Sequence, residues 1–340
     1  MRKTKKILIL TDGNINHASS RIRAIQYIPN FEKEGYEITW IPRIPEKKIN
    51  ITKIFFPLQK RFLTIKRNLF LYFNPYHIVF IQRKIISENL LQRQKKKKAK
   101  IIFDFDDAIY INEKDKNAES KIRKVIENSD YIIVSNQFLK DFTEKYNKNV
   151  IIVTTPIDTE IIKPNTGKSL TEEIKIGWIG SSWTTKYLSI IEKPLADLSE
   201  NYKIKLILIG ANNSYHPAGI NYQHFKWTYK DESKLLQMID VGVMPLTNEE
   251  YSKAKGGYKI LQYMAAGIPT IASPIGINTE IIEQGVTGLL ATTQEDWKNS
   301  FLLFIKNKQL ILDYGKNARN IAVSKYSRDI CYEKIKKFLE

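Results

Sequence analysis

Short runs of apolar residues alternate along the chain with longer segments whose apolar residues recur at helical spacing. In the first half, these runs predict strands at residues 7–11, 37–41, 77–82, 101–105, 131–135 and 150–154. Helical spacing and helix-end signals predict helices at residues 21–33, 120–128 and 138–146. This alternation is typical of an α/β protein with a parallel, doubly wound sheet.

The second half repeats the alternation and suggests a second domain. Apolar runs predict strands at residues 174–179, 205–210 and 241–245. Helices are predicted at residues 232–239 and 297–339, the last with a break near Tyr326 and Ser327, and the polar residues 211–218 are predicted to form a loop.

A chain of 340 residues is long enough for two domains. The stretch between Pro156 and Glu172 has two prolines, one glycine and few large apolar residues, as expected of a linker. We therefore expect a first domain at residues 1–160, a linker at 161–172, a second domain at 173–325 and a terminal helix at 326–340.

The segment KGGYKILQYMAAGIPTIAS in the second half is the expected functional centre. Gly256 and Gly257 precede a helix on which Lys255, Lys259 and Gln262 would share one polar stripe. Two lysines near a helix N-terminus, with no acid beside them, would be stabilised by an anion. The pattern therefore predicts a phosphate site, and an ordinary solvated lysine face is the alternative.

The first predicted strand ends in a polar loop, residues 12–20, that contains Gly13. Ligands of open parallel sheets lie at the carboxyl ends of the strands, so this loop and the start of the next helix are expected to face a ligand. The loop lacks the spacing of a dinucleotide-binding glycine motif. Arg21 and Arg23 instead suit a phosphate or an acidic acceptor group, or they pair with surface carboxylates.

Three carboxylates, Asp104, Asp106 and Asp107, mark the end of the strand predicted at residues 101–105. We expect them to orient acceptor hydroxyls or the two arginines, with helix capping as the alternative. His216 and His224 lie in predicted polar loops without the spacing of metal ligands, so no metal site is expected.

Residues 54–75 combine large apolar side chains with four cations and no acid. Apolar residues recur there at helical spacing, as in the set Phe62, Ile65, Leu69 and Phe73. This composition predicts an interfacial helix in peripheral contact with an anionic membrane, or a helix whose apolar side packs on the sheet. A second basic cluster at residues 95–100 favours the membrane contact.

The net charge of +18 favours an anionic partner, or it reflects a lysine-rich composition bias. The signatures of nucleic-acid-binding folds are absent, so no nucleic-acid partner is expected. No uninterrupted apolar run has the length that spans a bilayer. The single cysteine, Cys331, excludes an intramolecular disulfide and fits a reducing cytoplasm.

The central segment resembles the donor-binding segment of GT-B glycosyltransferases of the family 4 type. The matching residues include Gly256, Gly257, Met264, Ala265, Gly267, Pro269, Ala272, Ser273 and Gly276. Where that family carries two glutamates, this chain has Ala254 and Gln262, as in a divergent bacterial branch. Upstream, Gly180 and Lys186 match the first and last positions of a G-R-x-x-x-x-K element, with Ser181 replacing the arginine.

The resemblance implies two Rossmann-like domains that face each other across a cleft, with the last helix crossing back to the first domain. It also implies a nucleotide-sugar co-substrate, no essential metal or other cofactor, and retention of configuration with the leaving phosphate as base. Lys186, Lys255 and Lys259 are expected to neutralise the departing diphosphate, and Gln262 to contact the ribose. The expected donor-binding residues are Gly180, Ser181, Gly256, Gly257, Tyr258, Gln262 and Gly276.

These features together predict a glycosyltransferase in the cytoplasm or on the inner face of the cytoplasmic membrane. Its expected acceptor is a lipid-linked or cell-surface glycan intermediate, and its acceptor side would hold Gly13, the two arginines and the three aspartates. The alternative is a catalytically weak nucleotide-sugar-binding accessory subunit, because both family glutamates are absent.

Overall fold

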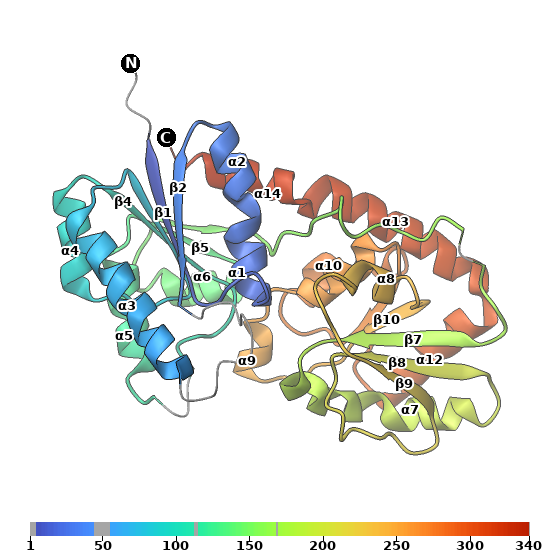
Figure 1. Cartoon of the computed structure of the whole chain (residues 1–340). Helices are drawn as coiled ribbons and strands as arrows, with labels where there is room; N and C mark the ends of the chain where they lie inside the picture. Colours follow the sequence, from blue (N-terminus) through green and yellow to red (C-terminus); the bar gives the residue numbers. More distant parts are fainter. Residues whose placement is uncertain (1–4, 44–54, 112–114, 168, 340) are drawn as a thin grey trace. The chain divides into compact units, whose positions relative to one another are not determined.

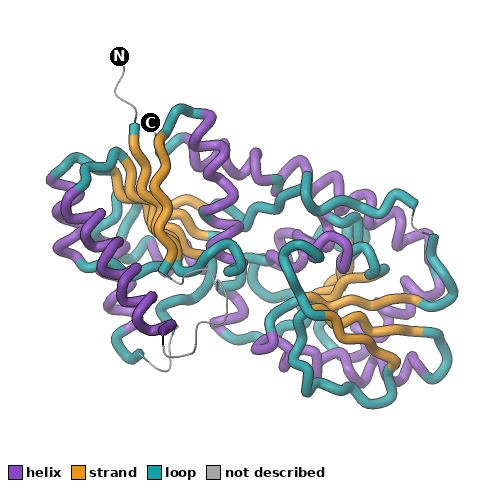
Figure 2. The backbone as a smooth tube through the Cα atoms, viewed as in Figure 1, coloured by secondary structure: helices purple, strands orange, loops and turns teal. Residues whose placement is uncertain are grey.

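The structure is a computed structural model in which the chain folds as two compact units, each built on its own parallel sheet (Figure 1, Figure 2). It describes residues 5–43, 55–111, 115–167 and 169–339. Unit 1 comprises Met1–Pro156, Ala254–Gly256 and Arg328–Glu340. Unit 2 comprises Ile157–Lys253 and Gly257–Ser327.

Unit 1 contains a six-stranded parallel sheet in the order β2-β1-β3-β4-β5-β6. The strands are β1 Lys6–Thr11, β2 Glu37–Pro42, β3 Ile78–Gln82, β4 Lys100–Phe105, β5 Tyr131–Val134 and β6 Val150–Ile152. The helices are α1 Ala18–Arg23, the 3-10 helix η1 Ile25–Tyr27, α2 Ile28–Lys33, α3 Phe55–Phe73, α4 Glu88–Lys96, α5 Ala118–Glu127, α6 Gln137–Thr143 and α14 Arg328–Lys336. The strands predicted for this half are confirmed.

The apolar strands of unit 1 are buried on both faces, as parallel strands covered by helices must be. One face holds Ile9, Phe80 and Ile102 against the aromatic residues of η1 and α2. Helix α14 adds Cys331 and Tyr332 to the same core, although it follows unit 2 in the chain. The last helix is therefore part of the first unit.

The single helix predicted at residues 21–33 is wrong in its extent. Helix α1 starts earlier, at Ala18, and the backbone leaves helical geometry at Ala24, where φ is -138°. A 3-10 turn follows, and α2 then starts with Pro29 in its first turn. Proline lacks a backbone N–H, so it suits a helix start better than a helix interior.

Unit 2 contains a second six-stranded parallel sheet, in the order β12-β11-β10-β7-β8-β9. The strands are β7 Ile174–Ile179, β8 Ile204–Ile209, β9 Asn221–Phe225, β10 Val241–Met244, β11 Thr270–Ala272 and β12 Gly288–Leu290. The helices are the 3-10 helix η2 Ser182–Leu188, α7 Ser189–Ser199, α8 Glu232–Leu236, α9 Glu250–Lys253, α10 Tyr258–Ala265, α11 Asn278–Ile281, α12 Gln294–Lys306 and α13 Lys308–Tyr326.

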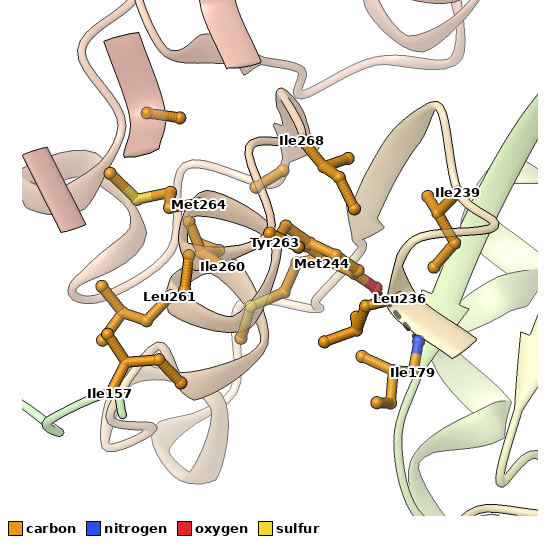
Figure 3. Close-up of a cluster of buried hydrophobic side chains, with 14 of the residues drawn as sticks. Ile157, Ile179, Leu236, Ile239, Met244, Ile260, Leu261, Tyr263, Met264 and Ile268 are labelled. Atoms are coloured by element: carbon orange, nitrogen blue, oxygen red, sulfur yellow. Dashed lines mark hydrogen bonds between the residues drawn. The ribbon is translucent and has the colours of Figure 1, made fainter. Parts of the chain in front are cut away.

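Neighbouring residues of β7 point to opposite faces of the unit 2 sheet, because side chains alternate along a strand. Trp178 joins the core below α7 and α12, whereas Ile179 joins the core around α10 (Figure 3). The strand β9 was not predicted, since no residue of its sequence NYQHF is fully buried. It lies at the sheet edge, where strong apolar alternation is not required.

The helix predicted at residues 297–339 is three helices, α12, α13 and α14, with an additional break at Asn307. Residues 161–172, predicted as linker, belong to unit 2. Ile162 is buried in the core around α10, and Arg319 donates to the carbonyl oxygens of Thr159 and Ile162. Among the described helices, none has the length and apolar character needed to cross a membrane.

Candidate functional site

The strand order of unit 2 reverses at β7, which pairs with β8 on one side and β10 on the other. In open α/β sheets such a switch point, at the carboxyl ends of the strands, is where ligands bind. Gly180 follows β7 there, and α10 follows β10 after a connecting segment. The carboxyl edge at Gly180 is therefore the first candidate site.

Lys259 of α10 lies directly beside Gly180. Its Nζ is 4.1 Å from the ring centroid of Trp178 and 3.5 Å from Oγ1 of Thr184. A Cβ atom at residue 180 would lie 2.5 Å from the Trp178 ring and 2.7 Å from Nζ of Lys259. Only a glycine leaves room for this arrangement, which holds an ammonium group at the end of the central strand.

Helix α10 is fastened to the sheet by Tyr263 (Figure 3). The ladder between β7 and β10 is limited to two residue pairs, so Ile179 has no partner on β10. The Tyr263 hydroxyl accepts from the Ile179 N–H at 3.0 Å and lies within 3.3 Å of the carbonyl oxygens of Gly177 and Val243. It fills the gap that opens as the strands diverge. Burial raises the pKa of Tyr263, so the hydroxyl stays protonated.

The predicted polar stripe of Lys255, Lys259 and Gln262 is wrong. Helix α10 begins at Tyr258, and its N-cap Gly257 has a left-handed φ of 68° that interrupts the helical spacing. Lys255 therefore precedes the helix and belongs to unit 1, and Gln262 is 3% exposed. Only Lys259 of the two lysines projects from α10 itself.

The other donor-side residues predicted from the sequence occupy nearby elements of unit 2. Ser181 and Lys186 follow Gly180, and Lys186 lies within η2 instead of opening a helix, with its Nζ over the rings of Trp183 and Tyr187. Tyr258 donates to Oε1 of Glu232 at 3.5 Å. Gly276 lies in the loop after β11, against the backbone of Lys253.

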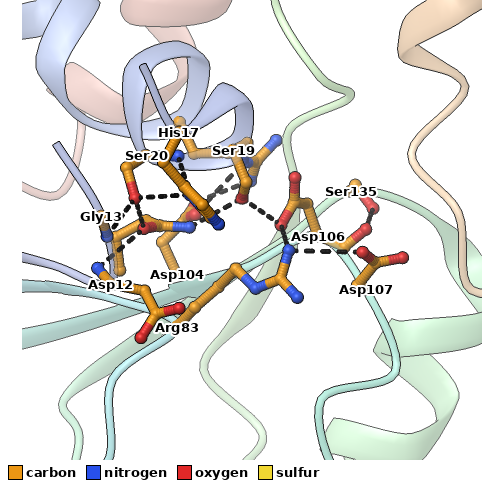
Figure 4. A network of polar contacts seen from close by, with 12 residues as sticks. Asp12, Gly13, His17, Ser19, Ser20, Arg83, Asp104, Asp106, Asp107 and Ser135 are labelled. Carbon is orange, nitrogen blue, oxygen red and sulfur yellow. Dashed lines mark hydrogen bonds and ion pairs between the residues drawn. The ribbon is translucent and has the colours of Figure 1, made fainter. Parts of the chain in front are cut away.

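A second polar site lies in unit 1, where the strand order reverses at β1. The Gly13 N–H donates to Oγ of Ser20 at 2.9 Å, and Ser20 donates to Oε1 of Gln82. The Gln82 amide donates to Ser19, which donates to Oδ1 of Asp106 at 2.6 Å. Figure 4 shows this chain of hydrogen bonds, which joins the ends of β1, β3 and β4.

Two of the predicted acceptor-side residues, Arg23 and Asp104, form a buried ion pair instead. Arg23 donates from Nη2 to Oδ2 of Asp104 at 2.6 Å and from Nη1 to the Val153 carbonyl oxygen, and both side chains are 1% exposed. Burial raises the pKa of Asp104 to about 6, against the attraction of the guanidinium. The direct ligand contact predicted for Arg23 is therefore wrong, because its donors already serve the fold.

Arg21 is also enclosed, with 4% of its surface exposed and Nη1 donating to the Ile15 carbonyl oxygen at 3.0 Å. The sequence did not predict this burial, because the helix was predicted to start at residue 21. That start would place Arg21 at the exposed end of a loop, whereas it lies within α1, which begins at Ala18. The prediction that the two arginines present a common phosphate-binding surface is not supported by their burial.

Asp106 and Asp107 form a more accessible pair with Arg83, which sequence reasoning missed. Nη1 of Arg83 lies 3.4 Å from Asp106 Oδ1 and 3.3 Å from Asp107 Oδ2. Burial raises the pKa of Asp107, and the positive charges of Arg83 and Lys255 oppose that rise. The same unit holds the Lys255 carbonyl, which accepts from Asn136 at 3.0 Å, and Gly256, whose Cβ position is blocked by Thr155.

The missed residues share a sequence position that could have revealed them. Gln82 and Arg83 come at and directly after the end of β3, at the same edge as Gly13 and Asp106. Trp178 lies within β7, two positions before Gly180, and Thr184 lies in η2, four positions after it. Within the part of the chain that the structure describes, no three His, Cys, Asp or Glu side chains are grouped so as to hold a metal ion.

Residues 173–307 match the family model described as "Glycosyl transferases group 1". An uncharacterized glycosyltransferase of Methanocaldococcus jannaschii is 24% identical over 241 residues, which cover 64% of this chain and 59% of that protein. A second such protein of the same organism is covered to 60%. The chain thus spans about three fifths of the length of the curated relatives it matches.

Solved structures share the fold over nearly the whole chain. A glycosyltransferase from Rickettsia africae has a TM-score of 0.73 at 14% identity, covering 99% of this chain and 98% of that one. HepE from Anabaena, solved with UDP and glucose, has a TM-score of 0.68 at 14% identity, covering 98% and 99%. Two six-stranded parallel sheets, one in each unit, are the α/β architecture that these structures share. The chain therefore has the GT-B fold, and its residues 173–307, the group 1 domain, match the glycosyl transferases group 1 model.

Proposed function

We propose that the protein transfers a sugar from a nucleotide-sugar donor to an acceptor. The observation that carries this proposal is the ammonium group of Lys259, held against Gly180 at the switch point of the group 1 domain. Departure of the nucleotide leaves negative charge on a diphosphate. A fixed cation and helix N-terminal amides at that position lower the barrier by several kcal/mol.

Within unit 2 the proposal assigns the diphosphate to Lys259 and Lys186, with Gly180, Ser181, Gly257, Tyr258 and Gly276 forming the surrounding backbone and side chains. Lys186 is exposed beside Trp183, six positions after Gly180. The bound UDP of HepE is consistent with a uridine nucleotide as donor. Lys255 and Gly256 belong to unit 1, so the donor cradle proposed for unit 2 does not depend on them.

The proposed reaction retains the anomeric configuration and uses the leaving phosphate as base, as the family resemblance implies. It therefore needs neither a protein nucleophile nor a metal, and we expect full turnover in the presence of a metal chelator. On the acceptor side, we assign Asp106 and Asp107 to the acceptor hydroxyls, with Arg83 orienting the two carboxylates. Gly13 is buried and its N–H is bonded to Ser20, so it supports this edge of the sheet without binding the acceptor itself. The proposed acceptor is a lipid-linked or cell-surface glycan intermediate met at the inner face of the cytoplasmic membrane.

Replacement of the two donor-side lysines tests the proposal. Lys259→Ala and Lys186→Ala are each expected to lower kcat with a nucleotide-sugar donor by about 100-fold or more, because each removes charge stabilisation present in the transition state. Lys316→Ala, which removes an exposed lysine of α13, is the matched control and should retain full turnover. Wild-type turnover in both site variants, at unchanged thermal stability, would contradict the assignment.

The second candidate function is a nucleotide-sugar-binding accessory subunit with little catalytic power. The observation that favours it is the loss of both family glutamates, since Ala254 and Gln262 occupy those positions and are 0% and 3% exposed. An accessory subunit would be stabilised by UDP or a UDP-sugar in a thermal-shift assay yet show neither transfer nor donor hydrolysis. An enzyme would show the stabilisation and the turnover together.

A further inference from the structure

Helix α3 turns an apolar face to the solvent. Six large apolar residues of α3 expose between 44% and 67% of their surfaces: Leu58, Phe62, Ile65, Leu69, Tyr72 and Phe73. Their spacing of three and four residues places them along one side of the helix. A surface helix of a soluble domain normally shows polar residues on that side, so this stripe requires an explanation.

The exposed stripe is not the side of α3 that packs on the rest of unit 1. The helix already buries Leu71 completely and Arg67 to 8% exposure, so its inner side is packed within unit 1. A cation, Arg67, thus lies on the inner side of α3 while Phe62 and Phe73 lie on the outer side, and burial lowers the pKa of the Arg67 guanidinium. The alternative in which the apolar set of Phe62 and Leu69 packs on the sheet is therefore wrong, because both side chains are exposed.

Cations border the exposed stripe. Arg61 and Lys66 lie on the same exposed side of α3, and residues 55–73 contain no acid. The neighbouring helix α4 lies beside α3 (Figure 1) and places the Arg93 guanidinium 3.7 Å from the ring centroid of Tyr72. Lys97, just after α4, donates to the Tyr72 carbonyl oxygen at 2.6 Å. The surface that surrounds the apolar stripe is therefore positive.

A second copy of the chain is a poor match for this surface. The stripe has the spacing of a coiled-coil seam, and in a parallel pair Arg61 of one helix would face Lys66 of the other. Because α3 has no acid, an antiparallel pair would also leave its flanking cations without partners. A bilayer with anionic lipids can instead bury the apolar side chains of the stripe and bind the flanking cations through its negative headgroups.

We propose that the exposed face of α3, with the flanking cations of α3 and α4, docks the protein on an anionic lipid bilayer. The apolar side chains enter the boundary between headgroups and acyl chains, and Arg61, Lys66 and Arg93 stay at headgroup level. This inference deepens the proposed function. The link to a lipid-linked acceptor rests on that function, whereas the docking itself rests only on the residues of α3 and α4.

Flotation of the full-length protein with vesicles tests the docking. Vesicles of phosphatidylcholine with phosphatidylglycerol should carry the protein, and vesicles of phosphatidylcholine alone should carry much less. The double variant Phe62→Ser with Leu69→Ser should reduce vesicle binding by about tenfold or more, because it removes two apolar side chains that would enter the bilayer. Both side chains are exposed, so their replacement should leave the fold unchanged. Arg61→Gln with Lys66→Gln should reduce it about fivefold for each charge removed and weaken its salt dependence.

Matched controls come from unit 2. Leu312→Ser with Val323→Ser removes two exposed apolar residues of α13, and Lys230→Gln with Lys316→Gln removes two exposed charges. Both double variants should float like the wild type. Equal flotation of wild type and the Phe62/Leu69 variant would overturn the proposal. So would a dimer in sedimentation velocity that this variant abolishes, since the stripe would then belong to a second copy.

Nucleotide binding separates this inference from the proposed function. UDP should stabilise the Phe62/Leu69 variant and the wild type to the same extent, because the altered residues lie in unit 1, outside the group 1 domain. A protein that binds anionic vesicles but neither UDP nor a UDP-sugar would support the docking and contradict the proposed function.

Discussion

The lack of a side chain at Gly180 allows Trp178 and Lys259 to meet at the end of β7. The Trp178 ring is fully buried within a core cluster, so a shift of the ring would disturb neighbouring side chains. The position of the Lys259 ammonium group thus depends on a residue that contributes no functional group of its own.

Gly180→Ala should therefore reduce both stability and turnover. The added methyl group forces Trp178 or Lys259 to move, and we expect a loss of about 1–3 kcal/mol in the free energy of unfolding together with a fall in kcat. Gly167→Ala is the matched control, because the nearest atom to its new Cβ is 3.8 Å away. The two variants can be compared by urea denaturation and by donor turnover, and equal behaviour would contradict the close approach at Gly180.

Residue identity alone did not reveal the pairing of Arg23 with Asp104. The two residues are 81 positions apart, and both residue types also suit an acceptor site. The fold brings α1 over the end of β4, where a buried charge is tolerated only with an opposite charge and hydrogen bonds. Arg23 and Asp104, which were predicted to contact a ligand, therefore form a buried structural ion pair.

At the scale of elements, one buried hydroxyl links α10 to the sheet, in addition to the apolar side chains that α10 places in the core. Tyr263 hydrogen-bonds the backbone of β7 and contacts that of β10, where the two strands separate (Figure 3). Because Lys259 lies one turn earlier on the same helix, this hydroxyl also sets where the ammonium group is held.

Tyr263→Phe should cost about 1–3 kcal/mol in the free energy of unfolding, because the buried N–H of Ile179 loses its acceptor. Tyr146→Phe, which removes a surface hydroxyl bonded to Glu119, should cost much less. Chemical denaturation of both variants measures the difference. If Tyr263→Phe were neutral, the N–H would have another acceptor and the hydroxyl would not fasten α10.

Helix α3 shows what periodicity can and cannot predict for an element. Its spacing predicted a helix, and the structure confirms one over Phe55–Phe73. Periodicity does not say which side faces the core, because both sides contain apolar residues and cations. Packing against β2 and α4 selected the side with Arg67 and Leu71, and this left Phe62 and Leu69 exposed.

At the scale of the whole molecule, the end of the chain completes the core of the first unit. Cys331 of α14 is fully buried beside the Thr154 carbonyl oxygen, and Tyr332 packs against Tyr27 and Phe31. Residues 328–340 therefore contribute to the stability of unit 1, although unit 2 separates them from it in sequence.

The thiol of Cys331 reports on this arrangement. Burial raises its pKa to about 11, so near pH 8 the reactive thiolate is scarce in the folded protein. We expect a thiol reagent to leave the native protein unlabelled at pH 8 and to label it after denaturation, when the pKa falls to its ordinary value. Ser324→Cys on the exposed side of α13 supplies a positive control. Rapid labelling of the native wild type would show that α14 does not stay packed in unit 1.

The sequence by itself determined the alternation of strands and helices, the two parallel sheets and the resemblance of residues 173–307 to group 1 glycosyl transferases, because these depend on local periodicity and on contiguous motifs. The proposed roles of Gly180, Lys186 and Lys259 were predicted in the same way. Only the tertiary structure decided that Lys255 belongs to unit 1, that Arg23 forms an ion pair with Asp104 and that Arg83 forms one with Asp106. These outcomes depend on burial and on contacts between residues far apart in the chain, which local pattern does not encode.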